Sequence, residues 1–374
     1  MFTFRLASAF VGLLLMVACG SSPTAKPLAT ASSNPTSAAT PLRNAVLVGH
    51  SDNPAAVVLM TLSGTIIKTI PGVGVVSQHA VGAYLVVAGF GSTKGWTVDS
   101  TGTVTDVAPA AVAILSPTTT NGWTPPLIVD SSTAVIVLAG KNGLTANAVD
   151  LRKGAVRPLL PEVAYTGFMS YSALTLLDVS SDRKTVWLSK VTATDAVTGR
   201  LEIFGVDLRT GTVSSQGQAN ALAGAELAIS RDGKSLAGQE EAGTDSTHLA
   251  IRHLHVVTLG TSVDLDVQGT APYVGGQRTP SVLFAPGGAM VAWWGGLDNG
   301  SKTFQVNVST VEGAGRTLYN PTQMPFSNAL SGVLWVDPNT MVVQHDIETD
   351  TINATTGSVT FVSQKLNYLD AVLN

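Results

Sequence analysis

The chain has 374 residues, of which 12% are charged and 45% hydrophobic, and its formal net charge is −4. So few charges provide neither the basic stripe that a nucleic-acid backbone requires nor a strong field to steer an ionic partner, so we expect no nucleic-acid binding. Cys19 is the only cysteine, which excludes an internal disulfide.

Residues 1–18 have the features of an export signal. Arg5 supplies the positive charge, and the apolar run from Leu6 to Ala18 is shorter than the roughly 20 residues of a membrane-spanning helix. Met16-Val17-Ala18-Cys19 resembles the lipobox of bacterial lipoproteins, with Met16 in place of the usual leucine. The resemblance implies cleavage before Cys19, acylation of its sulfur, and anchoring in the cell membrane or the outer membrane, on the extracytoplasmic side. A free, buried Cys19 is the alternative.

Residues 19–42 are predicted to be the acylated cysteine followed by a flexible tether. Serine, threonine, alanine and proline dominate this segment, and Lys26 carries its only charge. Such a composition buries too little apolar surface to offset the entropy of ordering.

Residues 43–374 are predicted to form one all-β domain built from repeats. Short runs of valine, isoleucine and leucine alternate with turn residues, and helical periodicity is nearly absent. Glycine-bearing turns recur at intervals of about 40 to 57 residues, which is close to the period of propeller blades. The turns are Leu62–Thr65, Asp99–Gly102, Asp150–Gly154, Asp207–Gly211, Leu259–Thr261, Glu312–Gly315 and Ala354–Gly357.

A second type of turn lies upstream of six of these turns, between two apolar runs. The six are His79–Gly82, Asp130–Ser132, Ser180–Arg183, Ser230–Gly233, Ala285–Gly288 and Val336–Asn339. Together the two turn types define a repeating unit of four antiparallel strands.

Two of the turns carry a resemblance to a known family. Ser230-Arg231-Asp232-Gly233 is similar to the Ser-Pro-Asp-Gly turn, and Val206–Gly211 to the Asp-Leu-x-Thr-Gly turn, of TolB-type and related WD-repeat-like propellers of exported bacterial proteins. The likeness spans nearly all of residues 43–374. It implies a seven-bladed β-propeller of four-stranded antiparallel blades, although six to eight blades fit the spacing. An array of β-sandwiches is the alternative fold.

The first unit is one strand short. Ala45–Val48, Ala56–Leu62 and Thr65–Ile70 supply three strands, and Asn367–Asn374 follows the last turn and strand with no other evident use. We therefore expect this C-terminal segment to return as the innermost strand of the first blade and close the ring. A solvated tail is the alternative.

Acidic residues gather in the longer loops, which this topology places on one face. In a chain so poor in charge, they indicate a binding surface, although solvated loop tips would give the same pattern. The predicted binding residues are Glu240, Glu241, Asp245, Asp298, Asp346, Glu348, Asp350 and Trp123.

Motifs for catalysis and cofactor binding are absent from the sequence, and we predict no catalytic residue and no organic cofactor. His253 and His255 lie two residues apart, so on a strand both would point to one face and could hold a metal ion. A surface histidine pair without metal is the favoured alternative. Asp346, Glu348 and Asp350 could converge on Ca²⁺, but no glycine completes a calcium loop.

These features favour a lipid-anchored, monomeric propeller that binds a protein, peptide or glycan at the cell envelope without catalysis. An envelope hydrolase or lyase with its site in the central channel is the alternative, and it would require acid and base residues that converge there. A structural or sensory accessory domain for a separate partner is the third class.

Overall fold

The computed structural model describes residues 46–52, 55–74, 82–89, 91–99, 101–115, 126–164, 174–193, 199–219, 226–244, 250–259, 264–267, 282–297, 303–311, 315–319, 330–345, 348–363 and 367–372. All of them belong to one compact unit, residues 40–374. The predicted signal peptide and tether, with Cys19, lie outside the described residues.

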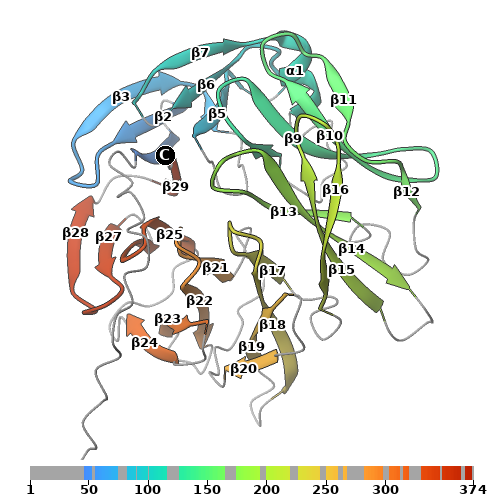
Figure 1. Ribbon diagram of the computed structural model, residues 1–374. Helices are drawn as coiled ribbons and strands as arrows, with labels where there is room; N and C mark the ends of the chain where they lie inside the picture. Colours follow the sequence, from blue (N-terminus) through green and yellow to red (C-terminus); the bar gives the residue numbers. More distant parts are fainter. Residues whose placement is uncertain are drawn as a thin grey trace, which may run out of the picture. The chain divides into compact units, whose positions relative to one another are not determined.

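The described residues form seven antiparallel sheets and one short helix (Figure 1). Sheet 1 contains, in the order of pairing, β29 (Asn367–Val372), β1 (Val46–Asp52), β2 (Ala55–Met60) and β3 (Ile66–Pro71). Sheet 2 contains β4 (Val73–Gly74), β5 (Ala83–Val87), β6 (Gly95–Asp99) and β7 (Val104–Val107). Sheet 3 contains β8 (Leu127–Ile128), β9 (Thr133–Ala139) and β10 (Gly143–Asp150), with β11 (Val156–Pro158) and β12 (Val163–Ala164) both paired to β10.

The other four sheets have four strands each, paired in sequence order. Sheet 4 contains β13 (Leu174–Val179), β14 (Thr185–Ala193), β15 (Gly199–Asp207) and β16 (Val213–Gln218). Sheet 5 contains β17 (Glu226–Ile229), β18 (Ser235–Thr244), β19 (Ala250–Thr258) and β20 (Asp264–Val267). Sheet 6 contains β21 (Val282–Phe284), β22 (Met290–Leu297), β23 (Thr303–Thr310) and β24 (Gly315–Tyr319). Sheet 7 contains β25 (Leu330–Asp337), β26 (Thr340–His345), β27 (Glu348–Asn353) and β28 (Val359–Ser363).

Strand β29 joins the two ends of the domain in one sheet. It pairs antiparallel with β1, with Val46 opposite Val372 and Gly49 opposite Leu369. Figure 1 shows the red strand β29 beside the blue strands of sheet 1. As predicted, the C-terminal segment thus joins the first unit.

The core consists of seven hydrophobic clusters, and each cluster draws its residues from two sheets. Tyr84 and Val86 of β5, for example, pack with Val57 and Leu59 of β2. Six clusters join consecutive sheets, and the seventh joins sheet 7 to sheet 1. Every residue of β5 is buried, because both faces of this strand are covered. Burial of each large apolar side chain contributes roughly 1.5 to 3 kcal/mol.

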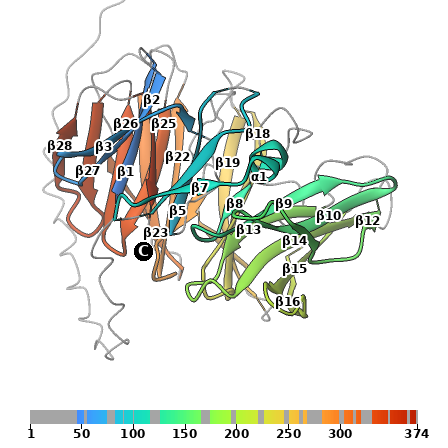
Figure 2. The same ribbon diagram turned by 90° about the horizontal axis from the view of Figure 1, so that it is seen from above.

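Helix α1 (Pro109–Leu115) departs from the predicted all-β fold. It begins at Pro109, whose ring fixes a helical φ and whose missing N–H costs nothing at a first helical position. Ala111, Val112 and Leu115 are buried against sheets 2 and 3, and Figure 2 shows the helix beside these sheets. Its seven residues are too short for a periodic pattern to be recognised.

Sheet 3 departs from the predicted four strands. Its outer edge is split into β11 and β12, which pair with opposite ends of β10. Pro158 ends β11, because proline cannot donate to a strand ladder, and Leu159 and Leu160 then turn into the core. Pairing resumes at Val163, opposite Leu144.

Two of the predicted glycine turns show how side-chain acceptors hold them, whereas most of the turns Leu259–Thr261 and Glu312–Gly315 lies outside the described residues. In the Asp207–Gly211 turn, Asp207 Oδ1 accepts hydrogen bonds from the backbone N–H groups of Arg209 at 3.0 Å and Thr210 at 2.6 Å. Gly211 has φ 73°, a left-handed conformation that glycine adopts without strain. Asn353 plays the same part in the Ala354–Gly357 turn, where it accepts from Thr355 and Thr356.

Candidate functional site

The acidic residues predicted to bind a partner are only partly described. Asp245, Asp298, Asp346 and Trp123 lie outside the described residues. The sequence predicts a loop at Glu240 and Glu241, and that prediction is wrong. Both residues lie in strand β18, where their backbones pair with His253 and Arg252 of β19. The hairpin is longer than its composition suggests, because backbone pairing continues through polar residues as far as Thr244.

Glu348 and Asp350 were also expected in an exposed loop, and that expectation is wrong. Both lie in strand β27, and Asp350 is only 4% exposed. Its backbone pairs with Val343 of β26 and Phe361 of β28, so the residue occupies a middle strand of sheet 7.

The metal prediction concerned His253 and His255. Both lie in β19, two residues apart. In the backbone register, His255 is opposite Asp266 of β20. Among the described residues, no three side chains of histidine, cysteine, aspartate or glutamate are grouped to hold a metal ion. The metal site at His253 and His255 stays a prediction.

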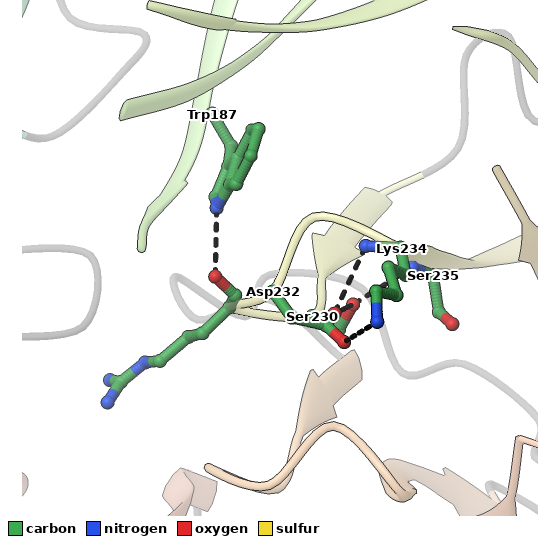
Figure 3. A network of polar contacts seen from close by, with 6 residues as sticks. Trp187, Ser230, Asp232, Lys234 and Ser235 are labelled. Carbon is green, nitrogen blue, oxygen red and sulfur yellow. Dashed lines mark hydrogen bonds and ion pairs between the residues drawn. The ribbon is translucent and has the colours of Figure 1, made fainter. Parts of the chain in front are cut away.

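The polar side chains that the structure does bring together lie at the short turns between first and second strands. In sheet 5, Ser230 Oγ donates to Asp232 Oδ1 at 2.6 Å and accepts from the backbone N–H of Ser235 at 2.9 Å (Figure 3). Asp232 Oδ1 also accepts from the backbone N–H of Lys234 at 3.1 Å. The carboxylate and the hydroxyl thus satisfy the backbone of the turn.

The corresponding turn of sheet 4 repeats this network. Ser180 Oγ donates to Asp182 Oδ1 at 2.7 Å and accepts from Thr185 N–H at 2.9 Å, and Asp182 Oδ1 accepts from Lys184 N–H at 3.1 Å. The hydrogen bond from Ser180, followed by that from the Lys184 backbone, lowers the pKa of Asp182 below its ordinary value. Asp182 also forms an exposed ion pair with Lys184 at 3.2 Å.

The Ser230–Gly233 turn of sheet 5 is linked to two strands of sheet 4. Arg231 Nε lies 3.5 Å from Asp178 Oδ2 of β13, and both side chains are nearly covered, with exposed fractions of 11% and 12%. Trp187 of β14 donates its indole Nε1–H to the carbonyl oxygen of Arg231 at 3.3 Å (Figure 3). Asp178 and Trp187 lie opposite each other on neighbouring strands. This pair of residues in sheet 4 therefore contacts both the side chain and the backbone carbonyl of Arg231.

Arg183 occupies the fourth position of the Ser180 turn. Its φ is 59°, and it is the one residue other than glycine with a positive φ among those that the structure describes. Its half-buried side chain reaches Gly82, in the turn that precedes β5 of sheet 2. A methyl group placed on Gly82 would lie 2.6 Å from Nη1 and 2.7 Å from Cζ of Arg183. The sequence offers no signal for this contact.

In the described part of the chain, no helix has the length and apolar character needed to cross a membrane. Neither a protein-family model nor a curated protein matches the sequence.

The described chain is an almost entirely β protein of repeated antiparallel sheets, and the solved structures similar to it include TolB-type β-propeller proteins. TolB from Acinetobacter baumannii is 16% identical, with a TM-score of 0.43 over 74% of this chain, and the chain spans 63% of that structure. An oligogalacturonate lyase in complex with manganese is 16% identical, with a TM-score of 0.46 over 77% of this chain and 76% of its own. A putative 6-phosphogluconolactonase from Bacteroides uniformis is 10% identical, with a TM-score of 0.47 over 88% and 99%.

Proposed function

We propose that the chain is a lipid-anchored, extracytoplasmic protein whose residues 43–374 form a closed, seven-bladed β-propeller. In this proposal the propeller binds a protein, peptide or glycan at the cell envelope and does not transform it. The observation that carries the proposal is the cyclic order of the seven hydrophobic clusters, each shared by two sheets.

The packing of sheet 7 on sheet 1 supports the closure. Val58 and Met60 of β2 are buried with Val336 and Val342 of sheet 7. The outer turn of sheet 1 also approaches the outer strand of sheet 7, since a methyl group added to Gly64 would lie 2.5 Å from the carbonyl oxygen of Val362. An open row of sheets would leave both of these surfaces in water.

The pairing of β29 with β1 supports the same conclusion. A ring held only by side-chain packing would leave sheet 1 with three strands and an open inner edge, which invites pairing with other chains. Strand β29 covers that edge, and it also contacts β25 of sheet 7 and β5 of sheet 2. One C-terminal strand therefore lies against strands of both neighbouring sheets, β25 of sheet 7 and β5 of sheet 2.

A closed ring is suited to binding because it holds loops from all sheets on a rigid frame. The acidic residues Glu240, Glu241, Asp245, Asp298 and Asp346 are proposed as part of the binding surface, with Trp123. The lipid at Cys19 is proposed to keep this surface at the membrane, through the tether of residues 19–42. The anchor rests on the lipobox resemblance.

The test is affinity capture with the tagged full chain from detergent-solubilised envelope, followed by mass spectrometry of the retained molecules. The captured ligand is then returned to the purified chain, and its mass is followed over time. A retained ligand of unchanged mass is the expected result. Conversion of the ligand to a product would replace the binding role with that of a hydrolase or lyase.

A further inference from the structure

Three short turns of the chain share one geometry, but the residue at their fourth position differs. The turns are Ser180–Arg183, Ser230–Gly233 and Ala285–Gly288. In each, the backbone N–H of the fourth residue donates to the carbonyl oxygen of the first, at 2.8, 2.7 and 2.8 Å. The fourth residues have φ of 59°, 73° and 72°. Two of them are glycine, and the third is Arg183.

The arginine is strained where the two glycines are not. In the left-handed conformation a Cβ atom crowds the following carbonyl, and glycine alone avoids this cost. The turns Ser230–Gly233 and Ala285–Gly288 show that glycine at the fourth position is enough to form this turn. A strained residue that the backbone does not require points to a role for its side chain.

In the part of the chain that the structure describes, no neighbour balances the charge of Arg183. Among the described residues, no hydrogen bond or ion pair is made by its guanidinium. The flanking Asp182 and Lys184 form their own ion pair, so they contribute no net charge. Arg183 therefore adds one uncompensated positive charge to this turn.

The side chain also reaches beyond the neighbouring sheet. Its guanidinium lies against Gly82 of sheet 2, whereas sheet 3 contacts both sheet 2 and sheet 4. In the proposed ring, sheets 2 and 4 are two positions apart. The guanidinium then lies across the short-turn end of the ring axis, opposite the end that carries the long loops.

We propose that Arg183 binds a carboxylate group of a ligand at this end of the ring, a second site that rests on the proposed ring and lies apart from the acidic surface at the other end. A guanidinium presents its N–H donors in a planar fork that matches the two oxygens of a carboxylate. A single positive charge balances a carboxylate, whereas the dianion of a phosphate monoester would keep one charge uncompensated. The contact with Gly82 holds the long side chain in place, which lowers the entropy lost on binding.

The experiment measures binding to the detergent-solubilised full chain with two pairs of probes. Acetyl-Ala-Ala with a free carboxylate is compared with its amide, and glucuronic acid is compared with glucose. We expect one acid to bind and its neutral partner not to bind, and the acid that binds identifies a peptide or a sugar source. Arg183→Gly should weaken binding of that acid by about tenfold to hundredfold, because charged hydrogen bonds are lost.

Two further variants control the test. Arg183→Gly should melt at or above the temperature of the wild type, because the substitution removes backbone strain. Lys234→Ala removes an exposed lysine directly after the Ser230–Gly233 turn, and it should bind the acid as the wild type does.

Three results would overturn the inference: equal binding of acids and neutral partners by the wild type, unchanged acid binding by Arg183→Gly, or a lower melting temperature of that variant. Partner capture by Arg183→Gly would in each case leave the proposed binding function standing.

Discussion

Trp187 and Arg231 join two sheets through one hydrogen bond, in which the indole Nε1–H of Trp187 donates to the Arg231 carbonyl oxygen at 3.3 Å. The side chain of the same Arg231 returns to Asp178 of sheet 4, at 3.5 Å. Backbone and side chain of one residue are thus both held by the neighbouring sheet. The contact links sheets 4 and 5 by polar groups, beside the apolar cluster that they share.

The first prediction concerns this pair. Arg231→Ala leaves the nearly covered carboxylate of Asp178 without its cation, and we expect the free energy of unfolding to fall by about 2 to 3 kcal/mol. The exposed pair of Lys234 and Asp232, at 3.9 Å, is the matched control, and Lys234→Ala should change stability by less than about 0.5 kcal/mol. Urea unfolding of both variants measures the difference. Equal effects would show that the covered pair contributes no more than an exposed one.

Removal of residues 367–374 tests the closing strand. The deletion removes the partner of β1 and exposes the edge of sheet 1, together with surfaces of sheets 2 and 7. The loss is comparable with the roughly 5 to 15 kcal/mol of a domain's net stability, so the variant should aggregate or melt far below the wild type. Deletion of residues 373–374 alone keeps β29 and serves as the control. A truncated chain with unaltered melting would refute the closed ring.

The Asp207 turn gives a prediction about pH. Hydrogen bonds from the backbone and hydroxyl of Thr210 lower the pKa of Asp207. A group whose folded pKa is lowered stabilises the fold above its unfolded pKa, and this contribution is lost as the pH falls through the folded value. Asp207→Ala should therefore lower the melting temperature at pH 7, and the difference from the wild type should shrink below roughly pH 4.

The turn at Asn353 suggests Asp207→Asn as the control for the pH dependence of the melting temperature. An asparagine there accepts the same two backbone hydrogen bonds as Asp207 does, without a charge. Asp207→Asn should thus keep the turn and melt close to the wild type, with a weaker dependence on acid. An identical dependence of Asp207→Asn and wild type on pH would show that the charge of Asp207 plays no part.

The membrane anchor is tested at Cys19. Cys19→Ser removes the only thiol of the chain, so no thioether to a lipid can form. The variant should accumulate as the uncleaved precursor or appear in the soluble fraction. Cell fractionation with intact-mass measurement distinguishes these states. A cleaved, unacylated variant that still partitions into the membrane would contradict the lipoprotein assignment.

The acidic residues of the β18–β19 hairpin provide the last prediction. Simultaneous substitution of Glu240 and Glu241 by glutamine, and of Asp245 by asparagine, should weaken capture of the ligand. Folding should persist, because the two glutamates contribute backbone pairing that glutamine retains. Arg152→Ala with Lys153→Ala, in a glycine turn of sheet 3, is the control and should leave capture unchanged. The reverse outcome would remove these acidic residues from the binding surface.

The turns were predictable because their causes are local. The turn Ser230–Gly233 holds everything it requires within four residues. Ser230 supplies the hydroxyl, Asp232 the carboxylate and Gly233 the left-handed backbone. Asp207 and Gly211 do the same for the other turn type. The spacing of such turns was enough to divide most of the chain into units of four strands, with sheet 3 as the exception.

Other features depend on contacts between distant residues, which one sequence does not reveal. Nothing near Arg231 marks Asp178 as its partner, and nothing near Arg183 marks Gly82. The sequence predicts a loop at Glu240 and Glu241 because polar strand residues give no hydrophobic alternation. The sequence places Asp350 on the surface because a charged residue carries no local sign of burial, whereas the structure has it 4% exposed in a middle strand of sheet 7.

The pairing of β29 with β1 also sets an order in time. Strands β1, β2 and β3 are synthesised first, but their sheet lacks its inner strand until residues 367–372 have been made. At the usual rate of about 5 to 20 residues per second, that interval lasts tens of seconds. During it the nascent sheet carries an open edge and an uncovered apolar face. Until then the edge of β1 is open to pairing with other chains.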